Sequence, residues 1–402
     1  MTDLVKLTDL DDGWIQNNRT GEVKPTLLPV GLWVKALKKL GNKLSFNLIT
    51  LKPELNGIPF QPDDMDTLYC HLGEFGYSMT KQASKDGILY AAMKNSYNPV
   101  VKELNYIETN DNITPVDIDN LASEYLGTND PLYDEMLAVA LIGAVARAFE
   151  HGCQMDYVIC LKGEQGLKKS DFWRVLAGDY FCETQQEQQK DLRMAMNCCW
   201  IFEYPEIECF TRQKNSGSTK SLITQRNDDF RPPFASSMGK YPRKSILVGS
   251  LNENEFLVDK TGSRRFYIID LPHNPDIGEK LDIDKLTRDR ERIFKAAIIA
   301  HRNGRKPMLP LELQNESNRR NIDFEHEHPY QRRIETKLKQ WGDIEFSIQG
   351  LIMDAQIKSY ETDITQTDIN DVAAIIKRLG YKKTRQFSGK SRARLWKRCQ
   401  HQ

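Results

Sequence analysis

Four short apolar runs between residues 156 and 272 constrain the fold of this chain most strongly. They read YVICL, CCWIFE, SILVGS and RFYIIDL, and polar loops separate them. Runs of this length, bounded by turn signals, are typical of strands buried on both faces of a parallel sheet. The intervening helices are expected to follow Ser170 and Ser221. The sequence therefore predicts a central α/β domain in a multi-domain chain.

Segments of different character flank this domain. The run DEMLAVALIGAVARAFEHG has the length of a buried helix and stops at Gly152, a residue type that suits a helix C-cap. The first hundred residues mix helical and strand-like patterns without recognisable chemistry. The predicted parts are an N-terminal α+β region (1–115), a helical bridge (116–152), the α/β domain (153–310), a charged linker (311–343) and a basic C-terminal unit (344–402).

Composition narrows the class of protein. Hydrophobic residues make up 40% of the 402 positions and charged residues 28%, which is typical of a soluble globular protein. No stretch of 18 apolar residues and no secretory signal is visible, so we expect a cytoplasmic protein without a membrane partner. The eight cysteines form no C-x-x-C pair and are interpreted as reduced thiols. His326 and His328 lack a clear third ligand, so we interpret them as part of a solvated linker.

The C-terminal unit carries a concentrated positive charge. Lys377 to Arg398 contain ten Lys or Arg and no acidic residue. A helix capped by Thr367 and ended by Gly380, followed by two short strands, predicts a winged helix that binds DNA phosphates. A solvated basic tail is the alternative. The residues expected to face phosphate are Lys377, Arg378, Lys382, Lys383, Arg385, Arg392 and Arg394, with Lys397 and Arg398 extending the patch.

The stretch GEQGLKKS, residues 163 to 170, resembles a phosphate-binding P-loop between a strand and a helix. Gly163, Gly166, Lys168, Lys169 and Ser170 would then form the ATP-binding loop. Lys169 would reach the β and γ phosphates, and the Ser170 hydroxyl would bind Mg²⁺. Lys168 stands where the pattern G-x-x-x-x-G-K-[ST] has glycine. A glycine-containing turn without nucleotide remains the alternative.

Three downstream motifs fit an ATPase. Glu203 ends an apolar strand with Glu206 just beyond, as magnesium binding and activation of water require. Asn252 follows another apolar strand, where its amide would sense the γ-phosphate, and Arg264 and Arg265 would add positive charge in the transition state. The alternatives are a strand-end charge, a turn-forming asparagine and a solvated arginine pair.

The order and spacing of these motifs resemble the virulence-associated protein E family of P-loop proteins, common in phages and mobile elements and related to superfamily 3 helicases. The resemblance rests on GEQGLKKS, WIFEYPEIE, the block from Asp228 to Phe266, and the upstream NSYNPVVKEL and LIGAVARAF. It implies an AAA+-like ATPase domain. It also implies phosphate, metal, sensor and arginine-finger roles for the residues just named.

The resemblance further implies DNA as a partner. The segment with Arg226, Arg231, Lys240 and Arg243 corresponds to the part that faces DNA in the central channel of superfamily 3 helicases; local pairing with Asp228 and Asp229 is the alternative. A homo-oligomeric ring, a hexamer, in a bacterial host cell is implied as well. No primase site is visible, so a primase or polymerase would be a separate partner.

Two departures from the family P-loop bear on activity. Lys168 adds a Cβ where the freedom of glycine is often needed, and Asp171 sets a negative charge near the expected phosphate. The leading hypothesis is an ATP- and Mg²⁺-dependent DNA helicase or initiator of a phage or mobile element. The alternative is a catalytically degenerate nucleotide-binding and DNA-binding regulator or assembly platform.

Overall fold

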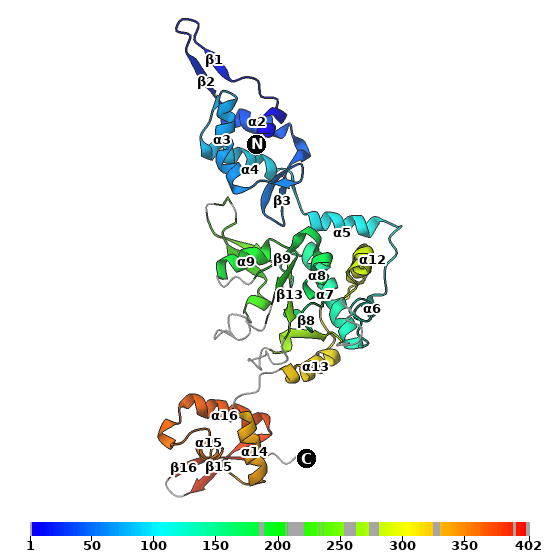
Figure 1. The fold of residues 1–402 in the computed structure, drawn as a ribbon, viewed down its shortest axis with the longest axis vertical. Coiled ribbons are helices and arrows are strands. Elements are labelled where there is room, and N and C mark those ends of the chain that lie inside the picture. Colours follow the sequence, from blue (N-terminus) through cyan, green and yellow to red (C-terminus); the bar gives the residue numbers. More distant parts are fainter. Residues whose placement is uncertain are drawn as a thin grey trace. The chain divides into compact units, whose positions relative to one another are not determined.

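The computed structural model describes residues 2–184, 189–205, 207, 221–232, 234–235, 237–252, 263–272, 281–324, 330–388 and 391–398. The chain forms two compact units, Met1–Glu325 and His326–Gln402 (Figure 1). Within the described ranges, no helix is long and apolar enough to cross a membrane.

The N-terminal region combines small sheets with helices, as the mixed pattern predicts. Trp33, Leu68 and Ile88 are completely buried in its core, and the indole of Trp33 donates to the Ser84 carbonyl at 3.2 Å. One sheet has the order β1-β2-β6 and the other β5-β4-β3-β7. The elements are α1 (Thr2–Leu7), β1 (Trp14–Gln16), β2 (Val23–Leu27), α2 (Val30–Lys38), β3 (Leu44–Asn47), β4 (Lys52–Leu55), β5 (Ile58–Pro59), α3 (Pro62–Glu74), β6 (Tyr77–Ser78), α4 (Lys81–Met93), β7 (Ser96–Tyr97) and α5 (Pro99–Thr109).

A buried helix leads into the α/β domain, as predicted. Helix α7 (Pro131–Phe149) follows the short α6 (Leu121–Tyr125), and the Asp130 side chain caps its first turn. Nearly every residue of α7 is buried, because α7 packs against the sheet, α5, α6 and the later α12 (Ile283–Arg302). Gly152 follows with a φ of +74°, a conformation that favours glycine.

The central sheet has five parallel strands in the order β14-β8-β13-β10-β9. Alternate residues pack on opposite faces: Ile159 and Leu161 lie in the core beneath α7 and α12, whereas Val158 and Cys160 pack with Leu192 of α9. The four predicted strands are confirmed, and β9 is an additional edge strand. The elements are β8 (Val158–Lys162), α8 (Lys169–Ala177), β9 (Phe181–Glu183), α9 (Gln189–Asn197), β10 (Ile201–Tyr204), β13 (Ile246–Leu251) and β14 (Phe266–Asp270).

An antiparallel hairpin precedes β13. Its strands are β11 (Asn227–Phe230) and β12 (Gly239–Pro242). Phe230 is buried in the hydrophobic core of the N-terminal region, and its ring lies 4.7 Å from that of Tyr241 between centroids. The hairpin therefore joins the N-terminal region to the α/β domain.

The expected linker 311–343 divides between the two units. Helix α13 (Leu311–Arg320) belongs to the first unit, and Asn321 beyond it donates to the carbonyls of Ser263 and Phe266 at 2.8 Å each. Helix α14 (Gln331–Trp341) belongs to the second unit, because its Ile334 and Leu338 are buried in that unit's core. The C-terminal unit thus begins before residue 344.

The second unit consists of α14, α15 (Ile348–Asp354), α16 (Gln366–Arg378) and a hairpin of β15 (Tyr381–Ser388) and β16 (Ser391–Arg398). Phe346 forms an isolated antiparallel bridge with Trp396, which is buried. The helix N-cap is Thr365, not the predicted Thr367, because Thr365 and Asp368 form a reciprocal capping box.

Candidate nucleotide site

The P-loop candidate connects the carboxyl end of β8 to the start of α8 at Lys169. Lys168 immediately precedes the helix with φ +62° and ψ +33°, in the left-handed region. Gly166 also has a positive φ, +92°. The Lys168 side chain is exposed, so it projects outward while its backbone adopts the conformation that glycine adopts most readily.

Lys169 is almost completely buried, although its side chain is cationic. Its Nζ donates to the Gly163 carbonyl at 2.6 Å, the Glu164 carbonyl at 2.9 Å and Asn252 Oδ1 at 2.8 Å. These acceptors hold the ammonium inside the curve of the loop. Phosphate oxygens entering the loop would have to compete with them.

Strand order explains why Asn252 reaches Lys169. Strand β13 lies directly beside β8, with Leu251 opposite Lys162. Asn252 directly follows β13, at the same end of the sheet where β8 is followed by the P-loop. Because parallel strands end at the same edge of a sheet, the predicted sensor and the predicted phosphate lysine come together.

Glu203 and Ser170 form the second contact of the site. Ser170 Oγ donates to Glu203 Oε1 at 3.0 Å. Glu203 has no exposed surface, and its Oε2 is buried without a hydrogen-bond partner in the described part of the chain. Burial raises the pKa of Glu203 to about 7, and the hydrogen bond from Ser170 and the neighbouring Ser250 hydroxyl oppose that shift.

The pair fits the ligand preferences of magnesium. Hydroxyl and carboxylate oxygens are the ligand types that Mg²⁺ takes in nucleotide sites, and the unpartnered Oε2 offers a free acceptor. Among the described residues, no group of three or more His, Cys, Asp or Glu side chains could hold a metal alone. Glu206 lies outside the described residues, as do His326 and His328.

Sequence reasoning missed Glu183 and Arg174. Glu183 ends β9 opposite Glu203 on β10, and its charge also raises the pKa of Glu203. Arg174 pairs with Glu183 at 3.0 Å and lies 3.9 Å from Asp171. Asp171 thus lies in the first turn of α8 beside a cation. In the sequence, the only sign of the edge strand β9 is the three residues FCE, and three residues are too few to show the alternating pattern of a strand.

Arg264 and Arg265 lie at the amino ends of the strands, whereas the P-loop lies at their carboxyl ends. They form a 3₁₀ turn that leads into β14, whose first residue Phe266 pairs with Val158 at the start of β8. The five residues of β8, at about 3.3 Å each, separate these amino ends from the P-loop. The structure does not bring either arginine to Lys169 of the same chain.

Four residues that precede β13 in the sequence were expected to contact DNA, and they divide into exposed and buried side chains. Arg226, Arg231 and Lys240 are exposed. The Nε of Arg226 donates to the Gly152 carbonyl at 2.9 Å, and that of Arg231 donates to the Ala235 carbonyl at 2.5 Å. Lys240 lies across the hairpin from Asp229.

Arg243 corrects the expectation of a DNA contact. It is completely buried, and its guanidinium binds both carboxylate oxygens of Asp228, at 2.6 and 3.1 Å, and the Leu222 carbonyl. Local pairing with Asp228, the alternative drawn from the sequence, describes this residue. Arg243 stabilises the hairpin from inside.

The second unit presents several of its predicted cations to solvent. Lys377, Lys382 and Lys383 are exposed, as are Lys397 and Arg398. Lys383 Nζ lies 5.5 Å from the centroid of the ring of Trp396, the residue opposite it in the hairpin. The side chains of Arg378, Arg385, Arg392 and Arg394 lie outside the described part.

Comparison with known proteins identifies one family. The model of the virulence-associated protein E-like domain matches residues 107–328, more than half of the chain. No curated protein sequence matches. Two solved structures of the NrS-1 C-terminal region, both described as the A form apo structure, are 12% identical to the chain. One has a TM-score of 0.44 and covers 70% of this chain and 77% of its own; the other has 0.40, 67% and 65%.

Proposed function

The chain belongs to the family defined by the virulence-associated protein E-like domain, and from the geometry of its site we propose that it is an ATP- and Mg²⁺-dependent DNA replication protein. It acts as a helicase or initiator of a phage or mobile element in a bacterial cell. The observation that carries the proposal is the convergence of three separate motifs, in which Lys169 contacts Asn252 and Ser170 contacts Glu203 at one edge of a parallel sheet.

Each side chain has a role in phosphoryl transfer. Lys169 exchanges its carbonyl and amide acceptors for β and γ phosphate oxygens, and Asn252 then senses the γ-phosphate. Ser170 and Glu203 would hold a magnesium ion, which would neutralise developing charge on the phosphates. Glu203 also orients the attacking water, with help from Glu206. Arg264 and Arg265 serve the site of a neighbouring copy in a hexameric ring, since they lie at the far edge of their own sheet.

Two surfaces of the protein bind DNA in this proposal. Arg226, Arg231 and Lys240 contact single-stranded DNA from the first unit. In the second unit, three helices, the bridge of Phe346 to the hairpin and the exposed lysines support a winged helix on duplex DNA. A primase or polymerase would act as a separate partner.

One observation favours the second candidate, a degenerate nucleotide-binding regulator or assembly platform. Lys168 occupies a left-handed conformation that costs a non-glycine residue roughly 1–2 kcal/mol. In this candidate, the loop binds nucleotide without positioning it for hydrolysis, and DNA binding continues without turnover.

Steady-state ATP turnover, measured with and without single-stranded DNA, distinguishes the candidates. The helicase or initiator requires turnover in the wild type that is lost in Lys169→Ala and retained in Lys168→Ala, which removes a charge outside the buried network. Turnover that is absent in the wild type and appears in Lys168→Gly supports the regulator. Turnover that survives in Lys169→Ala contradicts an active site at this loop.

A further inference from the structure

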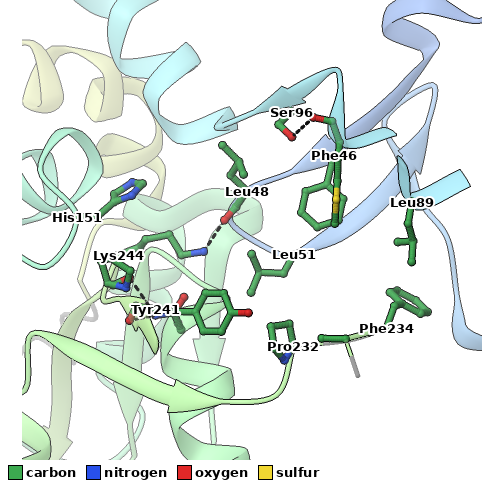
Figure 2. A pocket seen from close by; sticks show the side chains of 14 residues that line it. Phe46, Leu48, Leu51, Leu89, Ser96, His151, Pro232, Phe234, Tyr241 and Lys244 are labelled. Atoms are coloured by element: carbon green, nitrogen blue, oxygen red, sulfur yellow. Dashed lines mark hydrogen bonds between the residues drawn. The ribbon is translucent and has the colours of Figure 1, made fainter. Parts of the chain in front are cut away.

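A cavity of about 550 Å³ lies between the N-terminal region and the β11–β12 hairpin, apart from the nucleotide site (Figure 2). Phe46 and Leu51 line it from the N-terminal region, and Phe234 and Tyr241 line it from the hairpin segment. Its volume falls within the range of about 300–1,000 Å³ typical of ligand sites. None of the residues that line it in the described part of the chain is Asp or Glu.

The aromatic side chains of the cavity are held in place. Phe46 is buried, Phe234 and Tyr241 are half-buried, and the Tyr241 ring is supported by Phe230. All four nucleic-acid bases stack on such rings, because every base has a π face. The cavity thus offers aromatic faces on which a base could stack.

Asn197 adds a polar group to the wall. Its Nδ2 donates to the carbonyls of Tyr241 and Pro242 at 3.4 and 3.1 Å, which fixes the amide. Its Oδ1 is buried without a hydrogen-bond partner among the described residues. A buried acceptor without a partner costs free energy.

Cations flank the aromatic residues in the sequence. Arg231 precedes Pro232, and its Nε donates to the carbonyl of Ala235, another residue of the wall. Arg231 is exposed. Lys240 precedes Tyr241 within β12, so its exposed side chain lies on the opposite face of the hairpin, across from Asp229. Lys244 Nζ instead donates to the carbonyl of Leu48 (Figure 2) and to that of Ile49, so it braces the cavity rather than facing solvent. Aromatic faces with the exposed Arg231 beside them match a base joined to its phosphate.

We propose that this cavity takes up an unstacked base of single-stranded DNA, with Phe234 and Tyr241 against the base and Arg231 near a flanking phosphate. The inference rests on the proposed DNA-dependent function and deepens it. Taking up a base here would connect the strand to the hairpin that leads into β13 and Asn252.

The test compares an oligodeoxythymidylate with an abasic oligomer of the same length and charge. For the wild type, we expect the intact strand to bind at least about 5-fold more tightly, the equivalent of one stacked base. In Phe234→Ala this preference falls toward 1 while affinity for the abasic strand is kept. Phe234→Leu, which keeps an apolar side chain without the ring, also loses it. Tyr106→Ala, an exposed aromatic residue outside the cavity, retains the preference.

Photocrosslinking gives a readout that needs no variant. A strand with 5-iodouracil is expected to crosslink to Phe234 or Tyr241 in the wild-type protein. Equal affinity for intact and abasic strands, or crosslinks only elsewhere, overturns the base site while leaving the proposed DNA function intact. Failure to bind either strand contradicts the proposed function itself.

Discussion

Lys169 Nζ donates to Asn252 Oδ1 at 2.8 Å, although 83 positions separate the two residues in the sequence. The contact exists because β13 is inserted between β8 and β10 in the sheet. The same strand order leaves β10 close enough for Ser170 to reach Glu203. One topological feature thus accounts for both contacts that define the candidate nucleotide site.

Lys168→Gly is expected to strengthen nucleotide binding. The change removes the Cβ from a residue with φ +62° and gives the loop access to the conformations that phosphate selects. Lys168→Ala is the matched control, because it removes the same charge but keeps the Cβ. Nucleotide titration should show tighter binding in the glycine variant alone. An equal gain in both variants would assign the effect to charge instead.

The pKa of Glu203 predicts a pH-dependent stability. Burial raises that pKa to about 7, above an ordinary value of 4.5. Between these values the folded state keeps a proton that the unfolded state has lost, so the free energy of unfolding falls as pH rises from 4.5 through 7. The contribution is fully present below pH 4.5 and is on the order of 3 kcal/mol.

Chemical denaturation of wild type and Glu203→Gln across this pH range, without nucleotide or magnesium, isolates the effect. Other groups titrate in both proteins, so the difference between them reports Glu203. A wild-type advantage that diminishes as pH rises supports the assignment. A difference that stays constant with pH would show that Glu203 ionises normally.

Arg243→Ala is expected to destabilise the first unit by about 3–5 kcal/mol, because it leaves the buried carboxylate of Asp228 without its partner. Arg231→Ala, on the exposed part of the same segment, should change stability by less than about 0.5 kcal/mol. Denaturant unfolding measures both. Comparable losses in the two variants would argue against the structural role of Arg243.

The exposed lysines of the second unit predict a salt-dependent affinity for duplex DNA. Replacing Lys377 and Lys382 by alanine should reduce the slope of log affinity against log salt by about 0.9 for each phosphate that the variant no longer neutralises. Lys35→Ala, an exposed lysine of α2, serves as the control. A slope that does not change in the double variant would exclude these lysines from the DNA interface.

Local patterns in the sequence predicted the elements better than their partners. The strands that contain Ile159, Phe202, Val248 and Ile268 are confirmed, because buried parallel strands are apolar on both faces. The Thr365 cap could also have been read from its spacing to Asp368.

Contacts between residues far apart in the sequence could not be predicted. The burial of Arg243 depends on Asp228 across a hairpin, and charge alone does not distinguish an internal ion pair from a phosphate contact. The order of the strands in the sheet could not be predicted from the sequence either, because an apolar run has the same pattern whichever strand lies beside it. The cavity near Phe234 required both the hairpin and the N-terminal region to be placed.

The central claim is that Lys169 lies in a nucleotide site. The most direct measurement is the equilibrium dissociation constant for Mg·ATP of the wild type, Lys169→Ala and the control Lys168→Ala. We predict that the affinity of Lys169→Ala falls at least about 10-fold, equivalent to about 1.4 kcal/mol, while Lys168→Ala continues to bind. Equal affinity of the wild type and Lys169→Ala would contradict the account.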